Sequence, residues 1–549
     1  MRSPESSYTW RDRRAWPWLV LAGLAFVAGV WLRVWQLREQ TLIDDEWHAV
    51  RMLIGSDAAG IATHFGFADH CIPLTLYYRW LYDLGALSEW QMHLPLLIAG
   101  ILTLLVAPYL LRRTVAWPAR AIWLALLAIS PVLVYLSRTA RPYALDCLCV
   151  FVAIVAFDRW RRESSSLGWG LAYVLATVLA AWLHLLTVVF TLWPFVWFGL
   201  PALRNALRAS TRTAGRHELL RIALLALVTV ACLAIVLVPP IAGDWRAMAA
   251  KAGAGEVDIQ TFYRSALMMF GVSSAWSGGL LAVLVAVGGR RLWRRERGFA
   301  AYVLSVIVVG IAAIALSRPA WVQHQQTLVR YALPVLPFVL LFIAEGIACA
   351  VEWLRMPALA AAAALFALIG LAFAGPIPRY YYAPNQFMGH ELFQFDYSAD
   401  ANPYATRLDL GPVPAFYRDL STRPAGSITL IESPARLISH FLPDPWYQAI
   451  HRQNVKFALA APLCGGEADE FPYTATGTRF RRMGRLADIV DGATWGADYL
   501  VLRLHPWSVP PGIDVPWPDM DACTAKVSAR LGDPVYRDGQ IVVFALAKK

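Results

Sequence analysis

Three consecutive carboxylates stand in the stretch TLIDDEWHAV, residues 41–50, directly after the first long apolar segment of the chain. They are Asp44, Asp45 and Glu46. A carboxylate can take a proton from a reacting hydroxyl, so each of the three is a candidate general base. The alternative is structural, because acids at the start of a helix interact favourably with its dipole, and Asp44 could be only a cap.

Arginines lie near the same predicted membrane boundary in two other segments. Arg138 and Arg141 belong to the turn YLSRTARPYALD, and Arg330 belongs to WVQHQQTLVRYALPVLPF. A guanidinium offers two parallel donors that suit a phosphate or a carboxylate. Arg330 could instead extend to the interface without a specific role, but a charge at a membrane span is by default a candidate for function. We therefore predict an anion site at this boundary, with a phosphate or a carboxylate as the ligand.

Further polar and aromatic side chains fall at the same level. They are candidates for lining a cavity or binding an acceptor: His70, Tyr77, His184, His324 and Tyr331. The alternatives are an interfacial aromatic belt for the tyrosines and a structural role for a single histidine. The carboxylates together with His64 and His70 could bind a divalent cation. An acidic cluster alone is weak evidence, so a divalent cation stays possible and no metal ligand is assigned. The seven cysteines form no metal-binding CxxC pair, and we predict no structural zinc site.

The composition is that of an integral membrane protein. Of the 549 residues, 58% are hydrophobic and only 16% are charged, against about 25% in soluble domains. The net charge is +11, but the basic residues occur in short segments between apolar runs. This arrangement indicates membrane topology, and we predict no nucleic-acid partner. The first apolar stretch is too long for a signal peptide and predicts an uncleaved span.

Apolar windows of about 20 residues predict transmembrane helices. Eleven are found, at 16–36, 94–111, 121–137, 142–158, 168–184, 185–203, 220–241, 266–288, 299–317, 331–353 and 357–375. With the N-terminus inside, the inner segments hold 21 Lys and Arg residues and the outer loops hold 10. The positive-inside rule therefore predicts a cytoplasmic N-terminus and places everything after residue 375 outside.

Two domains follow from this topology. Residues 1–375 form the predicted transmembrane domain, and residues 376–549 form a soluble domain with β-like runs SITLIES, ADYLVLRL and QIVVFALA. The first outer loop predicts a helix lying on the membrane surface, from DEWHAVRMLIGSDAAGIATHF. Cys464 and Cys523 lie in an oxidising compartment and could pair, although their spacing does not decide it. The predicted fold class is an α-helical polytopic membrane protein with juxtamembrane helices and a C-terminal α/β or α+β extracytoplasmic domain.

Five segments in order resemble the GT-C superfamily of membrane glycosyltransferases, in particular the branch of protein O-mannosyltransferases and aminoarabinose transferases. They are IDDEWHA, IPLTLYYRWLYDLG, SRTARPYAL, WLHLLTVVF and LVRYALPVLPFVLL, and the resemblance covers most of residues 1–350. IDDEWHA resembles the Asp-Glu motif of the family's first outer loop. Two features depart from the pattern: Asp44 is an additional acid, and Pro73 stands where two prolines are usual.

The resemblance implies transfer of a sugar from a polyprenyl-phosphate donor to a glycan, lipid or protein acceptor on the outer face of the bacterial inner membrane. It implies that Asp45 is the general base with Glu46 beside it, and that Arg141 and Arg330 contact the lipid phosphate. The cavity would be lined by Tyr143 and His184. It implies no cofactor with certainty.

Two other classes of function fit a polytopic chain. A transporter or flippase of a lipid-linked glycan would tend to show repeated halves and broken helices near the midplane. We find no such repeat, and the polar residues lie in outer loops. A catalytically inactive relative would have the same carboxylates, so the sequence leaves that alternative open.

Overall fold

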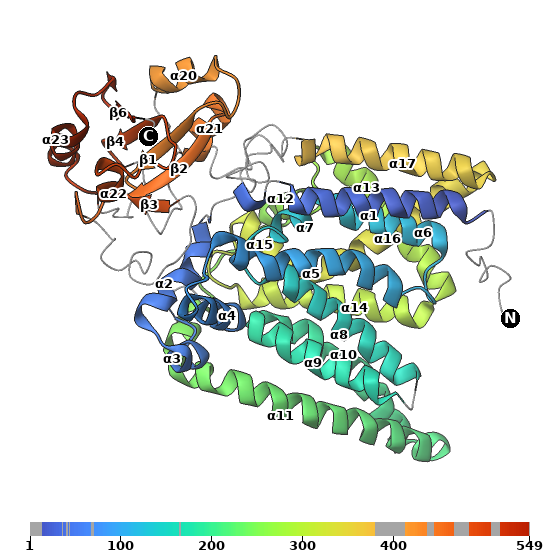
Figure 1. Ribbon diagram of the computed structural model, residues 1–549. Coiled ribbons are helices and arrows are strands. Elements are labelled where there is room, and N and C mark those ends of the chain that lie inside the picture. Colours follow the sequence, from blue (N-terminus) through green and yellow to red (C-terminus); the bar gives the residue numbers. More distant parts are fainter. Residues whose placement is uncertain are drawn as a thin grey trace.

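The computed structural model comprises a helical body and a domain built on a β-sheet (Figure 1). It describes residues 14–35, 37–39, 42, 44–66, 71–163, 166–378, 412–435, 444–465, 483–506 and 517–547.

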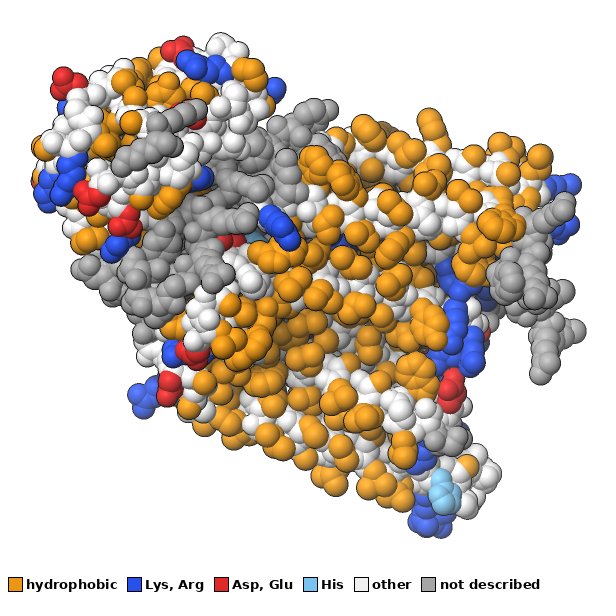
Figure 2. Space-filling view, in the orientation of Figure 1, with side chains coloured by type: hydrophobic (Ala, Val, Ile, Leu, Met, Phe, Trp, Pro, Cys, Tyr) orange, Lys and Arg blue, Asp and Glu red, His pale blue; other side chains and the backbone are white. Residues whose placement is uncertain are grey.

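Within these residues, seven helical segments are long and apolar enough to cross a membrane. They include the helices α1 (Trp16–Val34), α5 (Glu89–Leu110), α10 (Val188–Leu207), α11 (Arg212–Lys251), α14 (Arg297–Ser317), α16 (Leu336–Val351) and α17 (Pro357–Ala374). Hydrophobic side chains cover most of the visible face of this body (Figure 2). The chain is an integral membrane protein with multiple spans.

An eighth segment consists of α12 (Ile259–Phe270) and α13 (Ala275–Arg295), which meet at a bend of 77°. The predicted window 266–288 therefore contains a sharp bend between two helices. Gly271 ends α12 in the left-handed region, with φ of +68°, a conformation that glycine adopts at little cost. Ser274 then caps α13 by accepting a hydrogen bond from the backbone N–H of Ser277.

The remaining helices of the body lie among these segments. They are α6 (Trp117–Ile129), α7 (Pro131–Leu136), α8 (Tyr143–Arg162), α9 (Leu167–Leu183) and α15 (Gln325–Ala332), with short 3-10 turns η3 (Leu185–Thr187), η4 (Ala209–Thr211), η5 (Leu333–Val335) and η6 (Glu352–Leu354). The eleven predicted windows all fall on helices. Because α6 and α9 are short and α8 carries several charges, the number eleven stays a prediction.

The segment after α1, which is the predicted first outer loop, forms 3-10 turns and short helices. They are η1 (Leu37–Glu39), η2 (Asp44–Glu46), α2 (Trp47–Gly55), α3 (Ala58–Thr63) and α4 (Ile72–Asp83). The predicted surface helix is divided in two, because Asp57 caps α3 and accepts a hydrogen bond from Gly60 N at 2.7 Å. Val50, Leu53 and Ile61 are fully buried in the main core. The apolar face of this segment therefore packs on protein instead of lying on the membrane surface.

The C-terminal domain contains a six-stranded mixed sheet with the order β3-β2-β1-β4-β6-β5. The strands are β1 (Thr429–Ser433), β2 (Asn454–Leu459), β3 (Met483–Arg485), β4 (Tyr499–Arg503), β5 (Tyr536–Arg537) and β6 (Ile541–Ala545). The first four run parallel, and β6 pairs antiparallel to β4. The three predicted β-like runs are β1, β4 and β6. This confirms a C-terminal domain that combines helices with a sheet.

Helices cover both faces of this sheet. They are α20 (Ala415–Ser421), α21 (Asp444–His451), α22 (Leu486–Val490) and α23 (Met520–Leu531). Leu430 and Val501 pack with Tyr417 of α20 on one face, while Ile431 and Leu500 form the other core. This alternation follows from the period of two along a strand.

Cys464 and Cys523 form a disulfide. Their Cα atoms are 5.0 Å apart, across a sequence separation of 59 residues. The bond ties the turn after β2 to α23. By loop-closure entropy, a crosslink of this span stabilises the domain by about 4 kcal/mol.

Two glycines allow α13 and α16 to approach closely. A Cβ on Gly288 would overlap the carbonyl oxygen of Phe342, and a Cβ on Gly346 would overlap that of Leu284. Small residues at such contacts let helix backbones pack tightly in a membrane. The neighbouring Gly289 has open space around its Cβ position.

We expect Gly288→Ala to destabilise the body by about 2 kcal/mol, because the added methyl group forces the two backbones apart. Gly289→Ala is the matched control and should be neutral or slightly stabilising, since alanine favours a helix. The measurement is the thermal unfolding midpoint of the purified protein in detergent. Equal midpoints for the two variants would contradict this account of the packing.

Candidate functional site

Asp45 and Arg330 form an ion pair, although 285 residues separate them. The Arg330 Nη1 atom donates to Asp45 Oδ2 at 2.5 Å. Asp45 lies in η2, directly beyond the first span, and Arg330 lies on α15. The side chains are 17% and 15% exposed, so both remain accessible. The predicted base and one predicted phosphate ligand are thus brought together.

Arg141 lies on the other side of Asp45. Its Nη1 atom donates to the backbone carbonyl of Asp45 at 3.5 Å, from the turn that precedes α8. Burial by itself lowers the pKa of Arg141, but Tyr143 and Asp45 raise it by more, so the net pKa lies above the ordinary value. The guanidinium stays charged at any ordinary pH.

The ring of Tyr143 lies near both arginines. The guanidinium carbon of Arg330 lies 5.6 Å from the ring centroid and that of Arg141 lies 6.0 Å from it. These distances are within the range of cation–π attraction. Two cations, one of them paired with the Asp45 carboxylate, therefore lie near a single aromatic ring.

His184 and Tyr331 continue this aromatic surface. Their rings stack with centroids 5.3 Å apart, and the edge of Tyr143 meets His184 at 6.1 Å. His184 occupies the break between α9 and η3, where the helix ends in an extended conformation. The sequence placed Tyr143, His184 and Tyr331 in the cavity group, and the structure brings all three beside the ion pair.

Asp146 is a site residue that the sequence prediction missed. Its side chain is 1% exposed, and Oδ2 lies 3.9 Å from Nδ1 of His184. One signal could have found it: Asp146 is an acid in the first turn of an otherwise apolar window, and such acids are rare.

Glu46 is placed differently from Asp45, although the two are neighbours. Its carboxylate is fully buried and accepts from Ala140 N at 2.5 Å, and it lies 2.8 Å from Nε2 of His93. Ala140 directly precedes Arg141. These contacts of Glu46 join η2, α5 and the arginine turn, and its predicted catalytic role beside Asp45 stays a prediction.

Arg138 is a predicted phosphate ligand, and that role stays a prediction. It is fully buried, and its Nη1 atom donates to the backbone carbonyls of Leu32 at 3.2 Å and Arg33 at 3.0 Å. These carbonyls end α1, where helix carbonyls lack intrahelical partners. Arg138 satisfies them, so we assign it to the packing of α1.

The other predicted residues have the following positions. Tyr77 donates from its hydroxyl to the carbonyl of Gln91 at 3.2 Å, and His324 stacks on Trp321 at the start of α15. Asp44 opens the turn η2. His70 lies outside the described residues. Roles for these four in the reaction stay predictions.

Metal-binding clusters are not found in the described part of the chain, where no three His, Cys, Asp or Glu residues gather closely enough. The His48 Nδ1 atom lies 3.8 Å from Asp45 Oδ1. The cations that the structure supplies here are Arg141 and Arg330. A divalent cation at this site stays an untested hypothesis.

No family model and no curated protein match the chain. Among solved structures, ArnT from Cupriavidus metallidurans in the apo state is similar, with 16% identity and a TM-score of 0.44, covering 97% of this chain and 100% of ArnT. ArnT bound to undecaprenyl phosphate is similar with 14% identity and a TM-score of 0.43, covering 98% and 100%. The Archaeoglobus fulgidus oligosaccharyltransferase has 12% identity and a TM-score of 0.43, covering 88% of this chain and 68% of its own.

Structural similarity to GT-C membrane glycosyltransferases thus extends over nearly the whole chain. The TM-scores lie below 0.5. We therefore infer function from the side chains of the site.

We expect Glu46→Ala to lower stability by about 3 kcal/mol, because it leaves His93 and the Ala140 N–H buried without their acceptor. Glu46→Gln keeps one acceptor oxygen and should lose less. Glu256→Ala, at an exposed position, is the control. Thermal unfolding of the purified variants checks this. A wild-type midpoint for Glu46→Ala would contradict this structural role.

Proposed function

We propose that the protein is a glycosyltransferase that moves a sugar from a polyprenyl-phosphate donor to a glycan, lipid or protein acceptor at the outer face of the membrane. The observation that carries the proposal is the cluster of Asp45, Arg330 and Arg141 around Tyr143. A reaction with a lipid phosphate as leaving group needs one base and adjacent cations, and this cluster supplies both.

Binding of the donor would rearrange the ion pair. In the structure, Arg330 neutralises Asp45. A donor phosphate carries negative charge and can accept the same guanidinium hydrogen bonds. With Arg330 and Arg141 on the phosphate, the Asp45 carboxylate becomes available to the acceptor. The site would thus be activated only when the donor is in place.

The chemical step is a displacement at the anomeric carbon. Asp45 takes the proton of the acceptor hydroxyl, whose oxygen forms a bond to the anomeric carbon. The bond from that carbon to the phosphate oxygen breaks, and the electron pair leaves with the polyprenyl phosphate. Arg141 and Arg330 stabilise the charge that develops on this phosphate. A single displacement of this kind inverts the anomeric configuration.

The aromatic side chains would hold the sugar. Tyr143, His184 and Tyr331 present ring faces and edges beside the two arginines. Such a surface can pack against the apolar face of a sugar ring. The Asp146 carboxylate, 3.9 Å from Nδ1 of His184, would help to orient the imidazole ring of His184. This arrangement favours a transferase over a protein that only carries the lipid across the membrane.

We also propose that the protein lies in the bacterial inner membrane with its N-terminus in the cytoplasm and its C-terminal domain outside. The uneven distribution of Lys and Arg supports this orientation. The domains would then be a catalytic membrane part, 1–375, and a soluble part, 376–549.

Asp45→Asn should abolish sugar transfer and leave the fold intact, because asparagine keeps the shape of the side chain but cannot take the proton. The measurement is transfer from a labelled polyprenyl-phosphate sugar by purified protein. Asp83→Asn is the control, since Asp83 is an exposed carboxylate paired with Arg79. Full activity of Asp45→Asn, or no transfer by the wild type with any tested donor, would favour a flippase or an inactive relative.

Arg330→Ala should weaken donor binding more than a hundredfold, since the loss of one partner of a charge pair in such a pocket costs about 3 kcal/mol. Arg330→Lys keeps the charge but not the planar fork, and we expect it to recover part of the affinity. Arg246→Ala, at an exposed position of α11, is the control. Donor titration measures the effect. Loss of folded protein for Arg330→Ala alone would make Arg330 structural.

A further inference from the structure

Arg112 and Arg120 form a cationic pair at the membrane end opposite to Asp45. Arg112 follows α5 and Arg120 lies in the first turn of α6, so the turn between these helices brings them together. They are close enough for their positive charges to interact unfavourably. Within the described residues, neither side chain has a carboxylate partner. Two like charges held together without an acid favour the binding of an anion.

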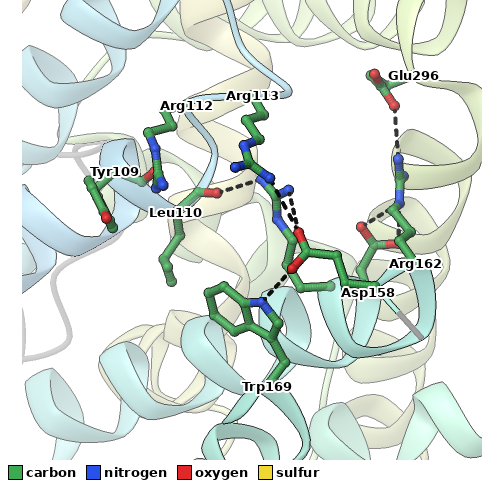
Figure 3. Close-up of polar contacts among 10 residues, drawn as sticks. Tyr109, Leu110, Arg112, Arg113, Asp158, Arg162, Trp169 and Glu296 are labelled. Atoms are coloured by element: carbon green, nitrogen blue, oxygen red, sulfur yellow. Dashed lines mark hydrogen bonds and ion pairs between the residues drawn. The ribbon is translucent and has the colours of Figure 1, made fainter. Parts of the chain in front are cut away.

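The neighbouring arginines are neutralised. Arg113 lies 3.4 Å from Glu163, whose other oxygen accepts from Trp169 Nε1 at 3.0 Å (Figure 3). Arg162 bonds to Asp158 at 3.0 Å and to Glu296 at 3.3 Å (Figure 3).

Arg112 instead points toward Tyr109, apart from these acids (Figure 3). Its Nη1 atom donates to the Tyr109 carbonyl at 2.9 Å. The absence of an acid therefore distinguishes the Arg112–Arg120 pair from the arginines around it.

Aromatic rings orient both guanidiniums. Arg112 lies 3.8 Å from the ring centroid of Tyr109, and Arg120 lies 4.0 Å from that of Trp117. The Nε atom of Arg120 is buried without a hydrogen-bond partner in the described part of the chain. Tyrosine and tryptophan are common at the membrane interface, where one side of the ring is apolar and the other is hydrated. The pair is therefore held at the level of the lipid headgroups.

An apolar stripe leads from this pair into the membrane. Ile98, Leu102, Leu105 and Tyr109 recur at helical spacing on α5 and are all exposed, between 41% and 60%. Residues with this spacing share one face of a helix. An acyl chain can lie along the stripe while its headgroup reaches Arg112, in the turn that follows α5.

We propose that Arg112 and Arg120 bind the phosphate of an anionic phospholipid whose acyl chain packs along the α5 stripe. The charge of the pair matches an anionic headgroup, and the exposed stripe matches a lipid better than a free phosphate. This end of the body is the predicted cytoplasmic end, where anionic lipids attract basic residues. The site is distinct from the Asp45 cluster and does not depend on the proposed reaction.

The test is native mass spectrometry of the purified full-length protein titrated with phosphatidylglycerol. We expect Arg112→Gln with Arg120→Gln to weaken retention about thirtyfold, since each basic residue near a membrane surface contributes to the binding of anionic lipid. The matched control is Arg290→Gln with Arg294→Gln, which removes two exposed arginines of α13 and the same charge. It should retain the lipid as the wild type does.

Three further measurements keep the proposal falsifiable. The double variant Arg112→Lys with Arg120→Lys preserves the charge. It is used in place of Arg112→Gln with Arg120→Gln if the latter does not fold. Phosphatidylcholine should be retained more weakly than phosphatidylglycerol, and glycerol 3-phosphate should compete poorly because it lacks acyl chains. An equal loss of phosphatidylglycerol in the two Gln double variants would overturn the proposal, because it would indicate a general attraction of the lipid to positive charge. Equal retention of the two lipids, or equally tight binding of glycerol 3-phosphate, would overturn it as well.

Discussion

The buried carboxylate of Glu46 is the constraint on which the site depends. It joins three parts of the chain: the turn η2, His93 of α5 and the backbone N–H of Ala140. A buried charge needs partners of this kind, because leaving it unpaired costs several kcal/mol. The requirement fixes η2 against the arginine turn. Asp45 and Arg141, each one residue away from these contacts, are placed together as a result.

Adjacent residues of the same chemical type therefore have different roles. Glu46 and Arg138 are fully buried and satisfy helix ends and backbone groups, whereas Asp45 and Arg330 keep part of their surface exposed. In a low-dielectric interior a buried ion is held tightly, and exchange for a ligand becomes costly. Only the partly exposed pair can exchange partners when a substrate binds. The buried residues therefore hold the site together, and the partly exposed residues are the ones that can contact a substrate.

Arginine has two uses at the two ends of the membrane body. At the Asp45 end, Arg141 and Arg330 surround an accessible carboxylate and aromatic rings. At the other end, most described arginines near α5 and α8 are paired with Glu163, Asp158 or Glu296, which ties the helix ends together. The planar, permanently charged guanidinium suits both tasks, since it forms several directed hydrogen bonds at once. The partner of each arginine determines whether the arginine belongs to the site or ties helix ends together.

The sequence by itself determined the membrane class, the helices at the predicted windows, three of the six strands and the segments that carry Asp45, Arg141 and Arg330. These features depend on apolar length and periodicity, which are local. Only the tertiary structure decided that Glu46 and Arg138 are buried, that Asp146 faces His184, that Cys464 pairs with Cys523 and that α12 and α13 meet at a bend. Burial and pairing depend on contacts between distant segments, such as the 285 residues between Asp45 and Arg330, and no local pattern encodes them.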